Sequence, residues 1–300
     1  MRTMVLDVGG TAIKSAVYDP DVKENYGLLD IAETPTQAHL GGEHVVETIL
    51  SVIKETRKKH DFCRIGISTA GEVDPEAGVI IHANENIPGY TGTPLAKIVS
   101  EAFSMPVRVE NDVNAAAIGE AAFGAGKDMS DFICLTYGTG VGGALFLNGN
   151  LFHGSSFSAG AFGAIVVHPE DRDPEKDMYL GGYEKYAAAT ALVKKAKAMD
   201  PSLTDGRKIF ERLHEPAVKA LVDEWTDEII YGLVSIVHMM NPSCLILGGG
   251  IMEQSYVTES VRSKLMKNIM PDFRNVQVRK AALGNRAGLL GAASLFQKEG

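Results

Sequence analysis

Three glycine-rich turns, each placed after an apolar run, have the composition of phosphate-binding loops. They are Gly9-Gly10 and the segments 138–143 and 248–250. Glycine lets backbone N–H groups approach an anion closely, and several such groups together favour phosphate. None of the turns matches the P-loop pattern or the dinucleotide fingerprint. Close packing would explain any one of them alone, whereas three turns at strand ends favour a nucleotide site.

Asp7 directly precedes the first of these turns. A carboxylate beside a bound phosphate repels it unless a cation lies between them, and Mg²⁺ prefers one or two carboxylates together with waters and phosphate oxygens. We therefore expect Asp7 to orient a magnesium ion at the phosphates of a nucleotide. The alternative is that Asp7 is an Asx-type turn residue.

A second acidic segment, Glu110-Asn111-Asp112, joins a predicted strand to an alanine-rich predicted helix. The carboxyl ends of parallel strands are where α/β proteins place their sites. There Asp112 could accept the proton of an attacking hydroxyl, and phosphoryl transfer needs little more than this acceptor, Mg²⁺ and donors that position the phosphates. The alternative is that Asp112 is only the N-cap of the helix, which is the commoner use of Asp there.

The hydropathy pattern alternates strands with helices, which favours an α/β fold. Predicted strands cover residues 3–8, 12–18, 63–68, 107–110, 131–137, 141–147, 245–247 and 276–279. Predicted helices cover residues 42–60, 94–103, 113–123, 183–199, 207–214, 217–240, 256–267 and 286–296. The charged, proline-containing stretch 169–177 predicts a loop.

The opening of the chain is repeated in its middle. An apolar run, a turn of Gly and Thr, and a second apolar run occupy residues 3–18 and again residues 131–147. We interpret this repeat as a duplicated α/β unit. The length of 300 residues is sufficient for two domains.

The composition excludes several classes of protein. A net charge of −9, from 38 acidic and 29 basic side chains, does not suggest a duplex-binding surface. Cys63, Cys134 and Cys244 lie far apart in apolar runs, so we expect reduced core thiols, no cysteine zinc site and a cytoplasmic protein. Asp7 lies too near the start for a secretory signal, and no apolar run approaches the roughly 18 residues of a membrane helix. We expect neither nucleic acid nor a membrane as a partner.

Taken in order, the motifs resemble those of the ROK-family sugar kinases (repressor, open reading frame, kinase). The similarity covers the family's first phosphate motif, catalytic segment, second phosphate motif, adenosine motif and C-terminal helix. The matching segments are residues 7–14, 110–120 with 123–126, 138–143, 247–251 and 288–293. The resemblance runs from about residue 3 to residue 296 and so covers nearly the whole chain.

This resemblance implies two actin-like (ribonuclease-H-like) α/β domains, with ATP and a sugar in the cleft between them, and a homodimer. We expect an N-terminal domain of residues 1–112 plus 287–300 and a C-terminal domain of residues 113–286. The implied reaction is ATP-dependent phosphorylation of a sugar hydroxyl at O6, with ATP and Mg²⁺ as cofactors.

The resemblance also assigns roles to single residues. Asp112 matches the family's general base, and Gly71, Asn84, Asn111 and Glu184 match its sugar contacts. The residues that match its nucleotide site are Asp7, Gly9, Gly10, Thr11, Lys14, Gly138, Thr139, Gly140, Gly249 and Gly250, with Asp7 as the metal ligand.

One segment departs from the family. Many members carry Gly-Glu-x-Gly-His after the second phosphate motif and then a Cys-rich zinc loop, whereas residues 160–164 read Gly-Ala-Phe-Gly-Ala and no such loop follows. We therefore expect no structural zinc and interpret His153 and His168 as ordinary polar residues. In common members the replaced glutamate and histidine hold the anomeric end of the sugar. Ala161 and Ala164 would leave room there for the aglycone or second ring of a β-glucoside.

Other functions are weighed against this one. The chain could be a kinase for free glucose or N-acetylmannosamine, or a non-catalytic sugar sensor, although its retention of Asp7 and Asp112 argues against the sensor. ROK repressors carry an N-terminal helix-turn-helix, and here a strand is predicted within a few residues of Met1. Other actin-like proteins, such as acetate kinases and chaperone ATPases, lack the Asn111-Asp112 segment.

Overall fold

A computed structural model describes residues 1–296 of the chain, which fold into two compact units. Unit 1 comprises Met1–Asp128, Leu151–Ala159 and Asn285–Gly300, and unit 2 comprises Met129–Asn150 and Gly160–Gly284. Unit 1 continues past the expected boundary at residue 112 because helix α3 (Asp112–Phe123) packs on helix α9 (Ala287–Ser294). Positions 297–300 of the expected N-terminal domain lie outside the described residues.

Unit 1 is built on a five-stranded sheet with the order β3-β2-β1-β4-β7. Its strands are β1 (Thr3–Val8), β2 (Ala12–Tyr18), β3 (Leu28–Pro35), β4 (Arg64–Thr69) and β7 (Val107–Asn111). β1, β2 and β3 form an antiparallel meander, and β4 and β7 continue the sheet parallel to β1. A separate two-stranded sheet contains β5 (Glu72–Asp74) and β6 (Val79–His82). The parallel strands bring their carboxyl ends, and therefore Asp7 and Asn111, to one edge.

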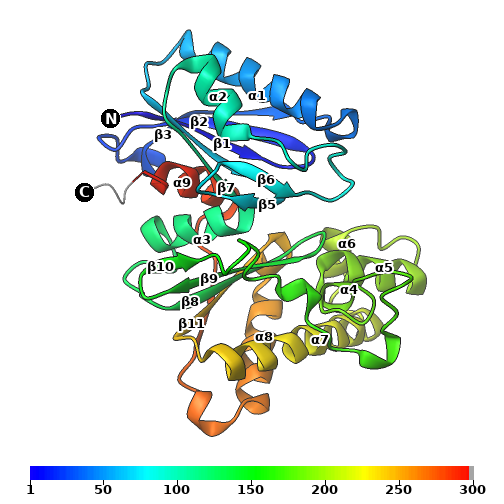
Figure 1. The fold of residues 1–300 in the computed structure, drawn as a ribbon. Coiled ribbons are helices and arrows are strands. Elements are labelled where there is room, and N and C mark those ends of the chain that lie inside the picture. The colour runs from blue at the N-terminus through cyan, green and yellow to red at the C-terminus, as the bar shows by residue number, and fades with distance from the viewer. Residues whose placement is uncertain (297–300) are drawn as a thin grey trace. The chain divides into compact units, whose positions relative to one another are not determined.

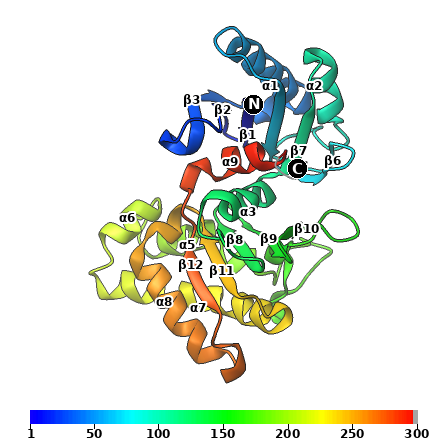
Figure 2. The ribbon, with the colours of Figure 1, turned by 90° about the vertical axis from the view of Figure 1, so that its left-hand side faces the viewer.

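Helices cover both faces of the sheet in unit 1. The helices α1 (Gly42–Arg57) and α2 (Leu95–Phe103) lie on one face, where Ile49 and Ile53 of α1 share a core with Leu6 of β1 (Figure 1). This helix forms because apolar side chains recur at helical spacing along its buried stripe. On the other face α9 packs against β1 and β4, with α3 beside it (Figure 2).

The packing of α9 is backbone against backbone. A Cβ atom on Gly66 of β4 would lie 2.1 Å from the Ala292 carbonyl oxygen, and one on Gly291 would lie 1.8 Å from the carbonyl oxygen of Ala115 in α3. No side chain fits at either position, so only glycine permits this approach. The close contact fixes α3, whose first residue is Asp112.

Unit 2 repeats the arrangement of unit 1. Its sheet has the order β10-β9-β8-β11-β12, formed by β8 (Phe132–Tyr137), β9 (Val141–Leu147), β10 (Asn150–Phe152), β11 (Cys244–Gly248) and β12 (Gln277–Lys280). β8 and β9 form an antiparallel hairpin, and β11 and β12 run parallel to β8. The shared order of connections confirms the predicted repeat. The helices of unit 2 are α4 (Glu184–Ala187), α5 (Ala189–Met199), α6 (Gly206–Glu211), α7 (Pro216–Met240) and α8 (Ser255–Asn268).

The structure corrects three predictions. The helix expected over residues 183–199 is broken at Ala188, which has φ −62° and ψ 153°. The indole Nε1 of Trp225 donates to the carbonyls of Ala187 and Ala188 at 3.2 Å, and the Ala188 carbonyl also accepts from the Ala191 N–H at 3.0 Å. Cys63 is exposed, so only Cys134 and Cys244 are core thiols. The edge strand β3 was not predicted, because most of its residues are exposed and lack an alternating apolar pattern.

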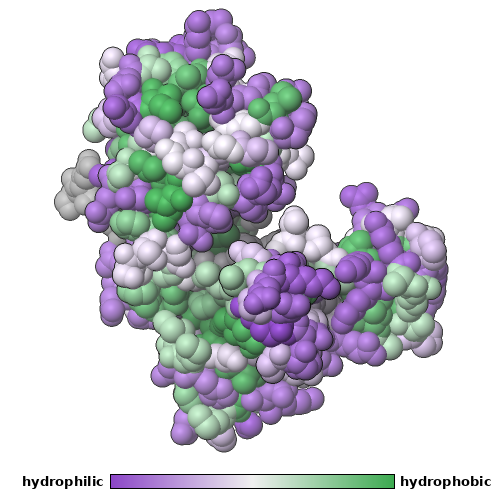
Figure 3. Space-filling view, turned by 45° about the vertical axis from the view of Figure 1, so that its right-hand side comes forward, coloured by the Kyte–Doolittle hydropathy of each residue, from purple (hydrophilic) through white to green (hydrophobic). Residues whose placement is uncertain are grey.

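On the face that Figure 3 presents, hydrophilic residues predominate and hydrophobic residues form separate small patches. Between residues 1 and 296, no helix combines the length and the apolar character needed to cross a membrane.

Replacing Gly291 by Ala tests the packing of α9 on α3. We expect a lower thermal unfolding midpoint, by an amount equivalent to about 1–3 kcal/mol, because the new methyl group overlaps the Ala115 carbonyl. The midpoint is measured by circular dichroism. Gly206→Ala is the matched control, because nothing lies within 4 Å of its Cβ position and alanine favours a helix. An unchanged midpoint for Gly291→Ala would contradict the packing.

Candidate active site

Asp7 lies near the carboxyl end of β1, opposite Lys14 on β2 and Ser68 on β4. The Ser68 hydroxyl donates to Asp7 Oδ1 at 2.8 Å, and Lys14 Nζ lies 3.9 Å from Oδ2. A Cβ on Gly288 of α9 would lie 2.5 Å from Oδ1, so glycine makes room for the carboxylate. Burial raises the pKa of Asp7, and Ser68 and Lys14 partly oppose that rise. Since side chains, not turn N–H groups, contact the carboxylate, the Asx-turn alternative is wrong.

The first glycine turn is open to a ligand. The Gly9 N–H closes the turn by donating to the Ala12 carbonyl at 3.0 Å, and the Thr36 hydroxyl donates to the Gly9 carbonyl at 2.6 Å. Gly10 and Thr11 are exposed, and their N–H groups donate to no other residue within 1–296. Two free N–H groups beside a lysine suit a phosphate oxygen.

Asn111, the last residue of β7, is the N-cap of α3. Its Oδ1 accepts from the N–H groups of Val113 and Asn114 at 3.0 and 3.1 Å. Its Nδ2 donates to the Gly71 carbonyl at 2.8 Å and to Asp112 Oδ1 at 3.0 Å. The alternative that Asp112 is the N-cap is therefore wrong, because its neighbour occupies that position and leaves Asp112 as the first helical residue.

The carboxyl of Asp112 has a higher pKa than an ordinary aspartate. Burial raises the pKa of its carboxyl to about 6, and the negative charge of Asp7 adds to the rise. Hydrogen bonds from Val113 and Asn111 oppose it. A carboxylate whose pKa lies close to neutrality is suited to accept a proton during turnover.

The expected sugar contacts of unit 1 are only partly brought together. Gly71 has φ +97°, and a Cβ there would lie 2.8 Å from the His82 carbonyl oxygen, so the position requires glycine. Its carbonyl joins it to Asn111 and thus to Asp112. Asn84 is exposed, and its Oδ1 accepts from the Asn86 N–H at 3.1 Å.

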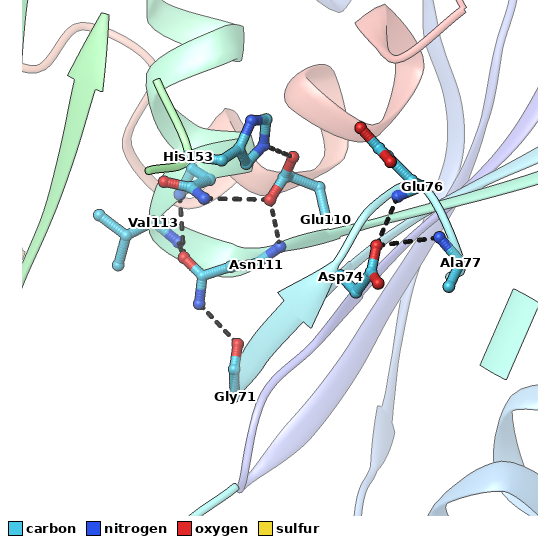
Figure 4. A network of polar contacts seen from close by, with 9 residues as sticks. Gly71, Asp74, Glu76, Ala77, Glu110, Asn111, Val113 and His153 are labelled. Carbon is cyan, nitrogen blue, oxygen red and sulfur yellow. Dashed lines mark hydrogen bonds and ion pairs between the residues drawn. The ribbon is translucent and has the colours of Figure 1, made fainter. Parts of the chain in front are cut away.

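Two residues without a predicted role lie directly behind Asn111. Glu110 is 2% exposed, and its Oε1 accepts from the Asn111 N–H at 2.9 Å and from Asn114 Nδ2 at 3.0 Å. Its Oε2 lies 2.8 Å from His153 Nε2 (Figure 4). His153 is therefore bonded to a buried carboxylate and is not an ordinary polar residue. Nothing in the local sequence signals a partner 43 positions away.

In unit 2 the second glycine turn packs against the last expected sugar residue, Glu184. A Cβ on Gly140 would lie 2.7 Å from Glu184 Oε2, and one on Gly163 would lie 3.0 Å from the same oxygen. The half-buried Glu184 has its pKa raised by burial. The Thr139 carbonyl accepts from the Thr190 hydroxyl at 2.7 Å.

The second and third glycine turns open onto one cavity of unit 2. Its volume is about 600 Å³, which falls within the range of small-molecule pockets. A Cβ on Gly249 would lie 2.2 Å from the Tyr137 carbonyl oxygen, so this glycine lets the third turn approach β8. The sequence predicted Gly138 and Gly250 as lining residues. It also placed Ile251 in the segment that matches an adenosine motif, and it missed the other lining residues, which are Tyr137, Ala189, Val193, Gly206, Arg207, Phe210, Glu211 and Gln254.

His168 follows the stretch 160–164, where the sequence departs from the family pattern. Its ring nitrogens lie 2.9 Å from Glu170 Oε1 and 2.8 Å from Glu228 Oε2. Burial alone lowers the pKa of His168, but these hydrogen bonds outweigh it and raise the pKa. The interpretation of His168 as an ordinary polar residue is therefore incomplete, because its ring joins two carboxylates. Over residues 1–296, no group of three or more His, Cys, Asp or Glu side chains could hold a metal ion.

Several known proteins that are similar to this chain are named as sugar kinases. A beta-glucoside kinase of Listeria innocua is 30% identical over 100% of this chain and 98% of its own length. A glucokinase of Streptomyces coelicolor is 31% identical over 99% of this chain and 98% of its own length. The solved structure of a ROK family glucokinase from Streptomyces griseus, in complex with glucose and AMPPNP, is 30% identical. The structural match covers 99% of this chain and 100% of the glucokinase chain, with a TM-score of 0.83.

These similarities confirm the expected fold of two α/β domains of the actin-like type. The family model described as the ROK family matches residues 3–299. The motifs at Asp7, Asn111-Asp112 and the glycine turns had suggested the same assignment. The chain belongs to the ROK family.

Proposed function

We infer that the protein is an ATP-dependent carbohydrate kinase. Membership of the ROK family and the similarity to kinases named for glucose and β-glucosides support this activity. The observation that carries it is Asp112 itself, a carboxylate with a pKa of about 6 held by Asn111 at the carboxyl end of β7.

In the proposed reaction, Asp112 is the general base. The sugar hydroxyl oxygen forms a bond to the γ-phosphorus of ATP while the bond from that phosphorus to the β–γ bridging oxygen breaks. ADP leaves, and the hydroxyl proton passes to the Asp112 carboxylate. Phosphoryl transfer demands mainly position and charge stabilisation, so one such acceptor is sufficient.

The nucleotide is proposed to bind through the glycine turns. The free N–H groups of Gly10 and Thr11, with Lys14 beside them, suit phosphate oxygens, as do Gly9 and the turn 138–140. The cavity lined by Gly138 and Gly250, next to Gly249, has the size for a nucleoside. The single carboxylate of Asp7 fits a magnesium ion that takes its other ligands from water and phosphate. When bound, this ion would neutralise charge on the phosphates.

The proposed acceptor is O6 of a hexose or a β-glucoside, contacted by Gly71, Asn84, Asn111 and Glu184. Asn111 already uses both N–H bonds and its oxygen within the protein, so its main contribution is to orient Asp112. Ala161 and Ala164, in place of the family's glutamate and histidine, favour a glycoside over a free sugar. A hydrogen bond to a charged group contributes about 1.5–3 kcal/mol, and free hexose would lack these bonds.

A coupled ADP-release assay with ATP and Mg²⁺ tests the function. Glucose, N-acetylmannosamine, cellobiose, gentiobiose and an aryl β-glucoside are compared by kcat/KM. We expect a glycoside to exceed free glucose. A preference for glucose or N-acetylmannosamine would make the protein a hexose or amino-sugar kinase, and silence on every sugar would favour the non-catalytic sensor.

Replacing Asp112 by Asn tests the base. We expect kcat to fall by about 10²- to 10⁴-fold, because the amide cannot accept the proton, while calorimetric affinities for sugar and MgATP stay within about threefold. Asp74→Asn is the matched control: Asp74 belongs to the same unit, and its carboxylate caps the turn at Glu76 and Ala77. Turnover unchanged by Asp112→Asn would refute the assignment.

The pH profile tests the acidity of Asp112. Below its pKa the carboxyl is protonated and cannot act as a base, so kcat/KM for the sugar should fall as the pH drops through about 6. The profile is recorded at saturating MgATP, with the coupling enzymes shown to remain in excess at each pH. An acid limb near the ordinary aspartate value of about 4 would contradict this prediction.

A further inference from the structure

The segment 151–159 leaves the sheet of unit 2 and belongs to unit 1. Two polar contacts hold it there. His153 Nε2 lies 2.8 Å from Glu110 Oε2, and the Ser158 hydroxyl donates to Glu72 Oε2 at 2.7 Å. The first contact reaches the carboxylate directly behind Asn111, and the second reaches β5.

Glu110 depends on its partners because it is almost completely buried. Its Oε1 accepts from the Asn111 N–H and from Asn114 Nδ2, whereas His153 is the one partner of Oε2 among the described residues. A carboxylate accepts only, so the imidazole Nε2 must donate. Removing that donor leaves a buried charge short of a partner, which is far costlier than losing a surface contact.

A Glu110 carboxylate that lacks a partner would change the position of Asp112. Oε1 of Glu110 holds the backbone N–H of Asn111 and the side chain of Asn114, and these residues form the turn from β7 into α3. Asn111 Nδ2 in turn donates to Asp112 Oδ1. A continuous series of hydrogen bonds therefore runs from His153 through Glu110 and Asn111 to Asp112, as Figure 4 shows for its first three members.

We propose that His153 is a positioning residue for phosphoryl transfer, which satisfies Glu110 and thereby fixes the turn that carries Asp112. The proposal rests on the proposed kinase function. His153 contacts neither Asp112 nor, in the proposed reaction, the reacting atoms. His153 supplies one N–H donor, at Nε2, to Glu110 Oε2. Its ring packs edge-on against Phe157.

Three variants separate the donor from the bulk of the ring. His153→Phe keeps an aromatic ring and removes the donor. His153→Gln restores an N–H at a similar reach without the ring. Ser158→Ala removes the other polar anchor of the same segment and is the matched control, since Ser158 has no place in the proposed machinery.

We expect kcat of His153→Phe to fall about 10- to 100-fold, with KM for MgATP within twofold of wild type, because the turn around the base loosens and the nucleotide contacts stay intact. His153→Gln should recover kcat to within about threefold, and Ser158→Ala should match wild type. Loss of the Asn111 bond removes an interaction that lowers the pKa of Asp112. The acid limb of the pH profile should therefore move to higher pH in His153→Phe and stay in place in His153→Gln.

The outcomes distinguish a failure of the positioning role of His153 from a failure of the kinase function. If His153→Phe keeps the kcat and the acid limb of the wild type, the positioning role is overturned and the kinase function is not. A lower thermal stability of His153→Phe, with constant turnover per folded molecule, would also overturn the positioning role. A wild-type protein silent on every sugar would refute the kinase function itself. Should His153→Phe fail to fold, His153→Asn replaces it, because its shorter side chain cannot reach Glu110.

Discussion

The site depends on how buried carboxylates are compensated at one edge of the sheet in unit 1. A carboxylate removed from water must be paired, hydrogen-bonded or protonated. Glu110 is satisfied by donors on three residues, and Asp7 by a hydroxyl and a lysine. Asp112 is bonded to the Asn111 side chain and the Val113 N–H, and its burial and the negative charge of Asp7 raise its pKa to about 6. We therefore propose different roles for one kind of side chain: an anchor at Glu110, a metal-orienting group at Asp7 and a base at Asp112.

The rigidity of this edge comes from backbone packing. Gly66 and Gly291 allow α9 to lie directly against β4 and α3, and Gly288 leaves room for the Asp7 carboxylate. Small residues therefore hold the start of α3 in a fixed position relative to β1. Such a frame is what a base needs, because a shift of about 1 Å in a reacting group can cost about 10²-fold in rate.

Two histidines, one on each side of the substituted stretch 160–164, contact carboxylates. Where many ROK proteins read Gly-Glu-x-Gly-His, residues 160–164 carry alanines at the glutamate and histidine positions. His153 precedes this stretch and bonds Glu110, and His168 follows it and joins Glu170 to Glu228. An imidazole bonded to a carboxylate therefore lies on each side of the substituted stretch.

The sequence by itself determined what depends on neighbours in the chain: most strands and helices, the glycine turns, the repeated hairpin and the Asn111-Asp112 segment. These follow from side-chain periodicity and turn chemistry, which act over a few residues. Only the tertiary structure decided which residue caps α3, that a predicted helix is interrupted at Ala188 beside the indole of Trp225, and that His153 contacts Glu110. Those contacts join distant positions, and whether they form depends on how whole elements pack and desolvate one another.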